Sequence, residues 1–322
     1  MTIFTFLAML LTASASFNTT SHDSKWNHFQ SFMDRFNKKY SSLDELKDRF
    51  EIFKDNLEFI HTHNALDKSY KLGINKFSDL TLDEFNLYKS FPFQQKCDKF
   101  TATSGNEPSS LDWRSKNAVT GVKDQGQCGS CWSFSASGAM EGAWAISHGS
   151  LVSLSEQQLV DCSKSYGNHG CNGGLMDGAF HYAMDNGMCT EDEYAYEASQ
   201  GTCRTCNPVV SISSCVDVTP SNELALKTAV SINPVSVAIE ADTRVFQMYK
   251  SGVLTSDACG TKLDHGVLTV GYGTEDNIEY WLVKNSWGTS WGEDGYIKIG
   301  RSDSEKSDGV CGIAMQPSYP VV

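Results

Sequence analysis

The stretch Gln125-Gly126-Gln127-Cys128-Gly129-Ser130-Cys131-Trp132 decides how the rest of this 322-residue chain is interpreted. Two cysteines three positions apart follow a glycine-rich turn, and Cys131 opens a segment with helical character. A thiol at a helix N-terminus faces unpaired backbone N–H groups and the positive end of the helix dipole, and both favour the thiolate. Three interpretations are open: structural cysteines, a redox-active pair, or a nucleophilic Cys131 with Cys128 bonded to a distant cysteine.

Composition narrows the class of protein. Aromatic residues make up 11% of the chain and hydrophobic residues 40%, which is typical of a globular protein with a large core. The net charge of −13 argues against a nucleic-acid partner, because nucleic-acid binding requires basic surfaces. Eleven cysteines predict an oxidising compartment, and their odd number predicts at least one unpaired thiol.

The first fifteen residues have the pattern of a signal peptide. A short apolar core from Ile3 to Leu11 precedes Ala13-Ser14-Ala15, a small-residue cleavage pattern. This core is too short to span a membrane, and no later stretch is apolar for long enough. We therefore assign residues 1–15 to a leader; Asn18 begins a glycosylation sequon directly after it.

Two amphipathic helices are expected next. Aromatic residues recur at helical spacing over 24–40, and Ser42 with Glu45 forms a capping-box pattern before a second apolar stripe that runs to Ile60. Joined by a short turn, these helices predict an αα-hairpin. Residues 73–79 are expected to be extended, and the Pro, Gly, Ser and Thr content of 90–110 predicts a linker with a functional boundary near Asn106.

The remaining chain changes character from helices to strands. Helices are expected at 134–147, after Ser155, and at 175–186, and strands at 235–239, 267–272, 280–283 and 295–299. Helices first and strands later predict an α+β protein with two lobes rather than a βαβ repeat.

Two downstream residues could activate Cys131. His265 directly precedes the strand 267–272, and Asn285 follows the strand 280–283, with Trp287 two residues later. An imidazole can take the thiol proton, and a third group must hold the ring in one tautomer and one orientation. The amide oxygen of Asn285 can do this without adding a charge.

These motifs resemble those of the papain-like cysteine peptidases. Cys128-Gly129-Ser130-Cys131-Trp132 is similar to the signature around the family's nucleophile, and Asn285-Ser286-Trp287-Gly288 to its asparagine motif. Asp112-Trp113-Arg114 resembles the start of a mature enzyme. The propeptide motifs of the cathepsin L-like branch are matched at Glu45, Arg49, Phe53, Asn56, Ile60 and Asn64 (ERFNIN) and at Gly73, Asn75, Phe77 and Asp79 (GNFD).

The resemblance implies a papain-like two-lobed α+β fold with a helical inhibitory prodomain. It implies a signal peptide at 1–15, a propeptide at 16–106 and a peptidase domain at 107–322, with a helical lobe at about 118–218 and a β-rich lobe at about 219–315. The implied activity is that of a cysteine endopeptidase made as a zymogen. A thioredoxin-like oxidoreductase and a catalytically silent homologue acting as a binding or inhibitor protein are the alternatives.

The resemblance also implies catalytic and substrate-binding roles for the residues that match the family's motifs. Cys131 is the implied nucleophile, His265 the base and later the acid, Asn285 the group that orients the ring, and Gln125 half of an oxyanion hole. No metal or organic cofactor is implied. The implied substrate-binding residues are Gly173, Gly174, Leu175, Met176, Ala238, Leu263, Asp264, Trp287 and Gln316. Their mostly apolar character predicts Leu, Val or Phe as the second residue before the scissile bond.

The resemblance also implies the disulfides Cys128–Cys171, Cys162–Cys203 and Cys259–Cys311. Of the remaining cysteines, Cys97 is expected to leave with the linker, and Cys206 and Cys215 could close a short loop. Cys203-x-x-Cys206 lacks the second pair of ligands that a zinc site would need.

Expected partners are peptide and protein substrates, the chain's own propeptide, and cystatin-type inhibitors, with the enzyme a monomer. The expected location is the secretory pathway, ending in a lysosome- or vacuole-like acidic compartment or outside the cell. Acidic residues over 44–58, together with Asp79, suggest that protonation loosens the propeptide before a cut near Asn106.

Overall fold

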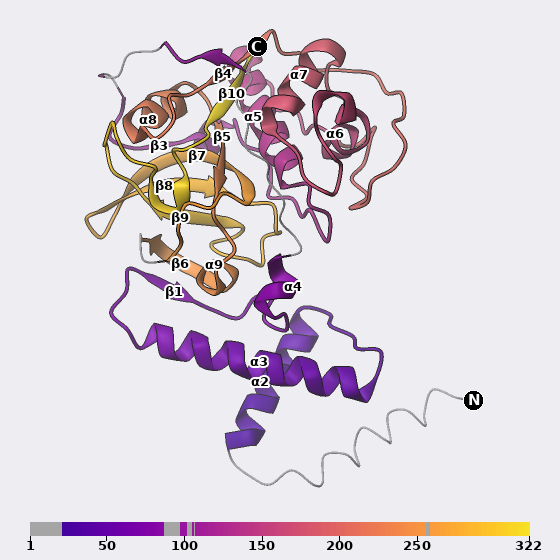
Figure 1. Ribbon diagram of the computed structural model, residues 1–322, viewed down its shortest axis with the longest axis vertical. Helices are drawn as coiled ribbons and strands as arrows, with labels where there is room; N and C mark the ends of the chain where they lie inside the picture. Colours follow the sequence, from indigo (N-terminus) through magenta and orange to yellow (C-terminus); the bar gives the residue numbers. More distant parts are fainter. Residues whose placement is uncertain (1–20, 87–96, 102–104, 106, 256–257) are drawn as a thin grey trace.

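A computed structural model describes residues 21–86, 97–101, 105, 107–255 and 258–322. The fold is α+β, as expected (Figure 1). Helices α2 and α3 lie at one end of the molecule, helices α5, α6 and α7 gather beside the sheet at the other, and strand β1 lies between the two ends. The leader at 1–15, the sequon at Asn18 and the boundary residue Asn106 fall outside the described residues.

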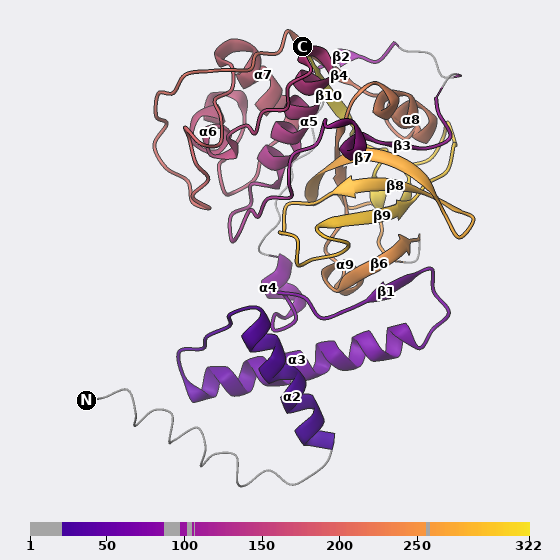
Figure 2. The same cartoon turned by 180° about the vertical axis from the view of Figure 1, so that it is seen from behind.

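The N-terminal region is built on two helices, α2 (Ser21–Arg35) and α3 (Leu43–Asn64). Helix α3 begins where the capping pattern predicts, because the Ser42 hydroxyl accepts the Glu45 N–H at 3.1 Å. The two helices share a hydrophobic core of four phenylalanines and one leucine: Phe29, Phe32, Phe50, Phe53 and Leu57. Figures 1 and 2 show α2 crossing α3 at a steep angle, so the pair is not the side-by-side hairpin that the short connection suggested.

The extended segment expected at 73–79 is wrongly placed. The strand β1 is Tyr70–Leu72, and it pairs antiparallel with β6 (Tyr249–Leu254) of the second half of the chain. Residues 75–79 instead form turns that are held by the Asn75 side chain, which accepts the Phe77 N–H at 2.9 Å. An Asx turn of this kind competes with strand pairing. Helix α4 (Leu82–Asn86) follows.

The helical part of the second region contains α5 (Cys131–His148), α6 (Glu156–Cys162) and α7 (Met176–Asn186). Gly149 ends α5 in the left-handed conformation, with φ at 71°. Ser155 caps α6 by accepting the Gln158 N–H at 2.9 Å. Two shorter helices accompany the strands, α8 (Glu223–Ile232) and α9 (Arg244–Gln247). One-turn 3₁₀ helices lie at Trp113–Lys116, Ser163–Tyr166 and Val310–Gly312.

The described strands form one ten-stranded sheet. Its centre is β5 (Val235–Ile239), β7 (His265–Glu275), β8 (Ile278–Lys284) and β9 (Tyr296–Gly300), which pair antiparallel in the order β9-β8-β7-β5. The sheet continues through β10 (Ser318–Val321), β4 (Ser214–Asp217) and β2 (Asp98–Lys99), while β3 (Leu111–Asp112) pairs with β7. The four strands expected from the sequence lie within or overlap the central four.

Disulfides join the elements. The bonds Cys128–Cys171, Cys162–Cys203 and Cys259–Cys311, which the resemblance implied, are present. The other two bonds are Cys97–Cys215 and Cys189–Cys206, so the loop suggested between Cys206 and Cys215 is wrong. The structure also contradicts the expectation that Cys97 leaves with the linker, because the disulfide bonds Cys97 to Cys215. Among the residues described, no helix has both the length and the apolar character needed to span a bilayer.

Candidate active site

Cys131 is the first residue of α5, and among the described cysteines it alone lies outside a disulfide. Its side chain is fully buried, and its sulfur accepts the backbone N–H of Gly266 at 3.4 Å. The residue before Gly266 is His265, the first residue of β7. Folding therefore brings the N-terminus of α5 to the start of β7. The positive end of the helix dipole at this position favours negative charge on sulfur.

Small side chains on α5 allow this helix to lie close to strand β7. Ser135 of α5 donates to the Val267 carbonyl of β7 at 2.7 Å, and its own carbonyl accepts the Ser236 hydroxyl at 3.0 Å. A Cβ at Gly138 would lie 2.7 Å from a methyl group of Leu268. The run of small residues on α5 thus sets how closely the helix lies on the sheet. Larger residues would separate Cys131 from His265.

His265 is oriented by Asn285. The ring Nε2 lies 2.8 Å from the Asn285 amide oxygen, which also accepts the Ser286 N–H at 2.8 Å. An amide oxygen only accepts hydrogen bonds, so Nε2 carries the proton and Nδ1 is left as the basic nitrogen of the neutral ring. Trp287 stacks on the imidazole with ring centroids 4.6 Å apart, and all three side chains are buried. The indole excludes water from the bond between His265 and Asn285.

Gln125 lies beside the cysteine motif and is buried. Its backbone N–H donates to the Ser286 carbonyl at 2.8 Å, and its amide oxygen accepts the Ser286 hydroxyl at 2.7 Å. The amide NH₂ donates to the Cys128 carbonyl at 2.8 Å. An amide NH₂ carries two hydrogens, so the second can serve another acceptor. Ser286 therefore positions Gln125, a role that sequence reasoning missed although Ser286 lies inside the asparagine motif.

The substrate-binding residues implied by the sequence fall into two groups. Met176 and Ala238 lie near the thiol: a Cβ at Gly266 would be 3.3 Å from the Met176 sulfur, and Ala238 pairs with Gly266 across β5 and β7. Gly174 packs on the Trp132 ring, where a Cβ would approach to 2.7 Å. Gly173 has a positive φ of 101°, a conformation that favours glycine.

The other implied residues lie in the segments that precede α7, β7 and β10. Leu175 is buried and immediately precedes α7. Leu263 packs on Gly312, where a Cβ would lie 2.7 Å from a Leu263 methyl carbon. Asp264 uses its carboxylate to accept the Ala241 N–H at 2.8 Å, which gives it a structural bond beside His265. Gln316 is 5% exposed and lies two residues before β10.

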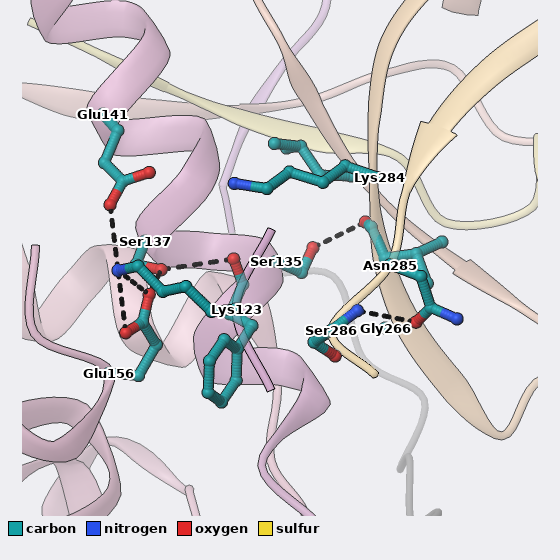
Figure 3. A pocket seen from close by; sticks show the side chains of 12 residues that line it. Lys123, Ser135, Ser137, Glu141, Glu156, Gly266, Lys284, Asn285 and Ser286 are labelled. Atoms are coloured by element: carbon teal, nitrogen blue, oxygen red, sulfur yellow. Dashed lines mark hydrogen bonds and ion pairs between the residues drawn. The ribbon is translucent and has the colours of Figure 1, made fainter. Parts of the chain in front are cut away.

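A buried charged cluster lies behind the site, and no sequence pattern predicted it (Figure 3). Lys123 donates to both carboxylate oxygens of Glu156, at 2.7 and 2.9 Å, and to Glu141 at 3.3 Å. Lys284, the residue before Asn285, donates to Thr120, which in turn donates to Glu141. A cavity of about 20 Å³ between these groups has room for roughly one water molecule.

The two carboxyl groups of this cluster differ in acidity. Burial, together with the neighbouring charge on Glu141, raises the pKa of Glu156 to about 7 in spite of Lys123. Burial acts on Glu141 in the same direction, but the charges on Lys123 and Lys284 outweigh it and lower the pKa of Glu141. Burial lowers the pKa of Lys284. The bonds of the cluster therefore tie α5 and α6 to Lys284, the last residue of β8 and the residue directly before Asn285.

A second acidic cluster lies near the disulfide Cys97–Cys215. The Cys97 sulfur and the carboxylates of Asp177 and Asp217 offer atoms within 4.8 Å of one another. Burial, with the charge on Asp177, raises the pKa of Asp217 to about 7. Because the sulfur is already in a disulfide, only two carboxyl groups could bind a metal there. Two such groups that share a proton are a sufficient explanation for the cluster.

Two family models match the chain. Residues 107–321 match the papain family cysteine protease model, and residues 29–85 match the cathepsin propeptide inhibitor domain. The chain belongs to the papain family. Cys131, His265 and Asn285, to which the resemblance assigned the catalytic roles, are all present in the sequence.

Relatives of this papain-family chain include plant proteases. It is 50% identical over 318 residues to the thiol protease SEN102 of Hemerocallis, covering 94% of this chain and 87% of the relative. It is 51% identical over 292 residues to the cysteine proteinase RD21A of Arabidopsis thaliana, covering 87% of this chain but only 63% of that protein. The chain thus spans less than two thirds of RD21A.

Solved papain-family precursors share the fold. A recombinant stem bromelain precursor superposes with a TM-score of 0.87 at 40% identity, covering 93% of this chain and 99% of the other. A digestive procathepsin L 3 from the larval midgut of Tenebrio molitor gives a TM-score of 0.84 at 42% identity, covering 92% and 99%. The likeness includes the N-terminal helices, so the arrangement of propeptide and peptidase is that of a papain-family proenzyme.

The propeptide residues contact the site through Trp287. Phe77 and Phe85 are buried and pack edge-on against Trp287, with centroid distances of 5.6 and 5.2 Å. Trp287 in turn stacks on His265. Backbone pairing of β1 with β6 and a bond from the Asn75 side chain to the Gln247 carbonyl at 2.8 Å hold this segment in place. The region that matches the propeptide inhibitor domain therefore lies against the aromatic group that stacks on the His265 imidazole.

Proposed function

We propose that this chain is a cysteine endopeptidase, made as an inactive zymogen, that hydrolyses peptide bonds through a thioester acyl-enzyme. The observation that supports this most strongly is the joint placement of three side chains. The Cys131 sulfur lies at a helix N-terminus against Gly266, the neighbouring His265 faces Asn285 at 2.8 Å, and all three side chains are buried.

The reaction follows from these positions. His265 Nδ1 takes the thiol proton, which leaves a thiolate–imidazolium pair, and the sulfur attacks the substrate carbonyl carbon. His265 then gives the proton to the leaving amine, the peptide C–N bond breaks, and a thioester remains. Water, deprotonated by His265, then attacks the thioester carbonyl carbon. The C–S bond breaks, the carboxylic acid product leaves, and His265 returns the proton to sulfur, which regenerates the thiol.

Gln125 and the Cys131 backbone N–H are assigned to the oxyanion hole. Gln125 has one amide hydrogen on the Cys128 carbonyl, and its oxygen is held by Ser286. This fixes the direction of the amide before substrate arrives, and preorganised donors of this kind each contribute about 3–4 kcal/mol to catalysis.

The disulfide Cys128–Cys171 argues against the oxidoreductase alternative, because Cys128 is then not available to cycle with Cys131. The intact cysteine, histidine and asparagine argue against a silent homologue. Labelling the processed enzyme with a thiol-directed epoxide tests the assignment. Wild type should be labelled at Cys131 and lose activity, while Cys131→Ser should be inactive and unlabelled; a Cys131→Ser variant that still cleaves peptides would refute it.

Substrate preference is assigned to the second residue before the scissile bond. Met176 and Ala238 beside the thiol, with Leu175, Leu263 and Gln316, would form an apolar pocket that accepts Leu, Val or Phe. Gln316 is neutral, so it cannot attract arginine strongly. In a panel of dipeptide substrates, Gln316→Glu should raise cleavage of those with Arg at this position. Unchanged selectivity would remove Gln316 from the pocket.

We assign the leader to 1–15, the propeptide to 16–106 and the peptidase to 107–322. Five disulfides support passage through the secretory pathway to an acidic compartment or out of the cell. Carboxylates of the propeptide pair with basic groups, for example Glu84 with Arg49 at 2.7 Å and Asp55 with Arg244 of the peptidase at 2.6 Å. Arg49 lowers the pKa of Glu84, so loss of that pair when Glu84 is protonated would loosen the propeptide and allow processing. Cystatin-type inhibitors and a monomeric state remain part of this proposal.

A further inference from the structure

The disulfide Cys97–Cys215 connects two parts of the chain that maturation is expected to separate. Cys97 lies between residue 85, where the match to the propeptide model ends, and residue 107, where the match to the peptidase model begins. Cys215 is 118 positions further on, within β4 of the peptidase. The bond therefore crosses the expected cleavage boundary near Asn106.

The residues that follow Cys97 form an extra strand on the peptidase sheet. Strand β2 (Asp98–Lys99) pairs parallel with β4, with Asp98 opposite Val216 and Lys99 opposite Asp217 (Figure 2). The Phe100 N–H donates to the Asp217 carbonyl at 3.0 Å, and the Phe100 ring meets Tyr319 of β10 edge-on at 6.4 Å. An added edge strand of this kind is held by backbone bonds as well as by the disulfide.

The attachment point itself is built into the peptidase core. Cys215 is 2% exposed, and the Cys97 backbone N–H donates to the Asp217 carboxylate at 2.9 Å. Asp177, in the first turn of α7, lies within 4.8 Å of both the Cys97 sulfur and Asp217. Residues 97–100 thus contact helix α7 and two strands of the peptidase. Their contacts resemble those of a permanent strand more than those of a disposable linker.

We propose that residues 97–101 stay on the mature peptidase through Cys97–Cys215, so that a cut near Asn106 alone does not release the inhibitory helices. This inference rests on the proposed zymogen function. After such a cut the propeptide is a second chain, still joined by one covalent bond, and it rebinds intramolecularly. Full release requires another cut before Cys97, which leaves Cys97 and its strand behind.

Disulfide mapping tests the retention directly. The full-length proenzyme is processed at acidic pH, alkylated with iodoacetamide, digested without reductant and analysed by mass spectrometry. The mature product should contain the Cys97 peptide, bonded by a disulfide to the Cys215 peptide. This result is expected whether or not the chain between the two cysteines has been cut. A mature product without the Cys97 peptide, with Cys215 alkylated or paired with another cysteine, would overturn the proposal. Epoxide labelling of Cys131 on the same sample reports the proposed function separately.

A second experiment tests the consequence for inhibition. A recognition sequence for a specific protease replaces residues 102–106 of the full-length chain, and the chain is cut there at neutral pH without reductant. In the parent, epoxide labelling of Cys131 should stay slow at every dilution. In the Cys97→Ser/Cys215→Ser variant, dilution to nanomolar concentration should speed labelling by roughly 100-fold or more, because the intramolecular advantage is lost.

The matched control removes a different bond. Cys189→Ser/Cys206→Ser lacks a disulfide that lies wholly within the peptidase, and its labelling should stay as slow as that of the parent at all dilutions. If the labelling rate of Cys97→Ser/Cys215→Ser depends on dilution no more than that of the parent, the Cys97–Cys215 bond does not maintain inhibition after the cut. If that variant does not fold, the mapping of the wild-type protein still decides whether the strand is retained.

Discussion

Replacing Phe85 by alanine should open the zymogen without changing the peptidase. Phe85 is fully buried and contacts Phe77 of the propeptide at 5.3 Å and Trp287 of the peptidase at 5.2 Å. Truncating a buried phenylalanine costs about 3–5 kcal/mol, counting lost transfer and the cavity left behind. Because Phe85 faces both regions, we assign about 2–3 kcal/mol to the contact between them, and this corresponds to about a 30- to 150-fold increase in the open fraction.

The rate at which a thiol-directed epoxide labels Cys131 measures this fraction. The uncut full-length chain is labelled at neutral pH, and the rate is proportional to the open fraction as long as opening is fast and rare. Phe85→Ala should be labelled about 30- to 150-fold faster than wild type. The variant's peptidase, once fully processed, should hydrolyse a dipeptide substrate at the wild-type rate.

Leu82→Ala is the matched control, since Leu82 lies in the same short helix but is 37% exposed. It should leave the labelling rate within about twofold of wild type, because exposed substitutions rarely cost more than about 0.5 kcal/mol. If Phe85→Ala is labelled no faster than Leu82→Ala, the aromatic contact on Trp287 does not hold the propeptide closed.

Three further predictions concern the site, the pH response and the fold. Asn285→Ala should lower kcat/KM by about 100-fold through misplacement of the imidazole, with unchanged thermal stability excluding a folding defect; activity within threefold or so of wild type would contradict the assigned role. Arg49 lowers the pKa of Glu84, so the stability contributed by this pair is present above the ordinary carboxyl pKa and lost as pH falls through the lowered one. Glu84→Gln should therefore label faster than wild type at neutral pH, and the two rates should converge under strong acid; parallel pH profiles would exclude this pair as a sensor. Gly129→Ala places a Cβ 2.5 Å from the Cys171 carbonyl oxygen and should lower the free energy of unfolding by about 1–3 kcal/mol. A thermal melt measures this loss, and a melting curve equal to that of wild type would disprove the prediction.

The amino-acid sequence by itself determined most of the local helices and strands and the residues proposed for catalysis. Periodicity located helix α3 and the central strands, and the cap residues Ser42 and Ser155 marked helix starts because a hydroxyl at that position satisfies a free N–H. The motif around Cys131 predicted this residue as the nucleophile of the proposed peptidase, and the order of the downstream histidine and asparagine motifs predicted its partners. These features depend on neighbours within a few residues or on fixed motif spacing.

Tertiary structure decided what distant residues do together. Cys206 and Cys215 are close in the chain, yet Cys215 bonds to Cys97, because a disulfide requires two Cα atoms about 5 Å apart in the fold rather than nearby in the sequence. The buried cluster of Lys123 with Glu141 and Glu156 likewise brings together positions that no spacing rule connects. Charges and thiols interact over a few ångströms of space, and only the folded chain sets those distances.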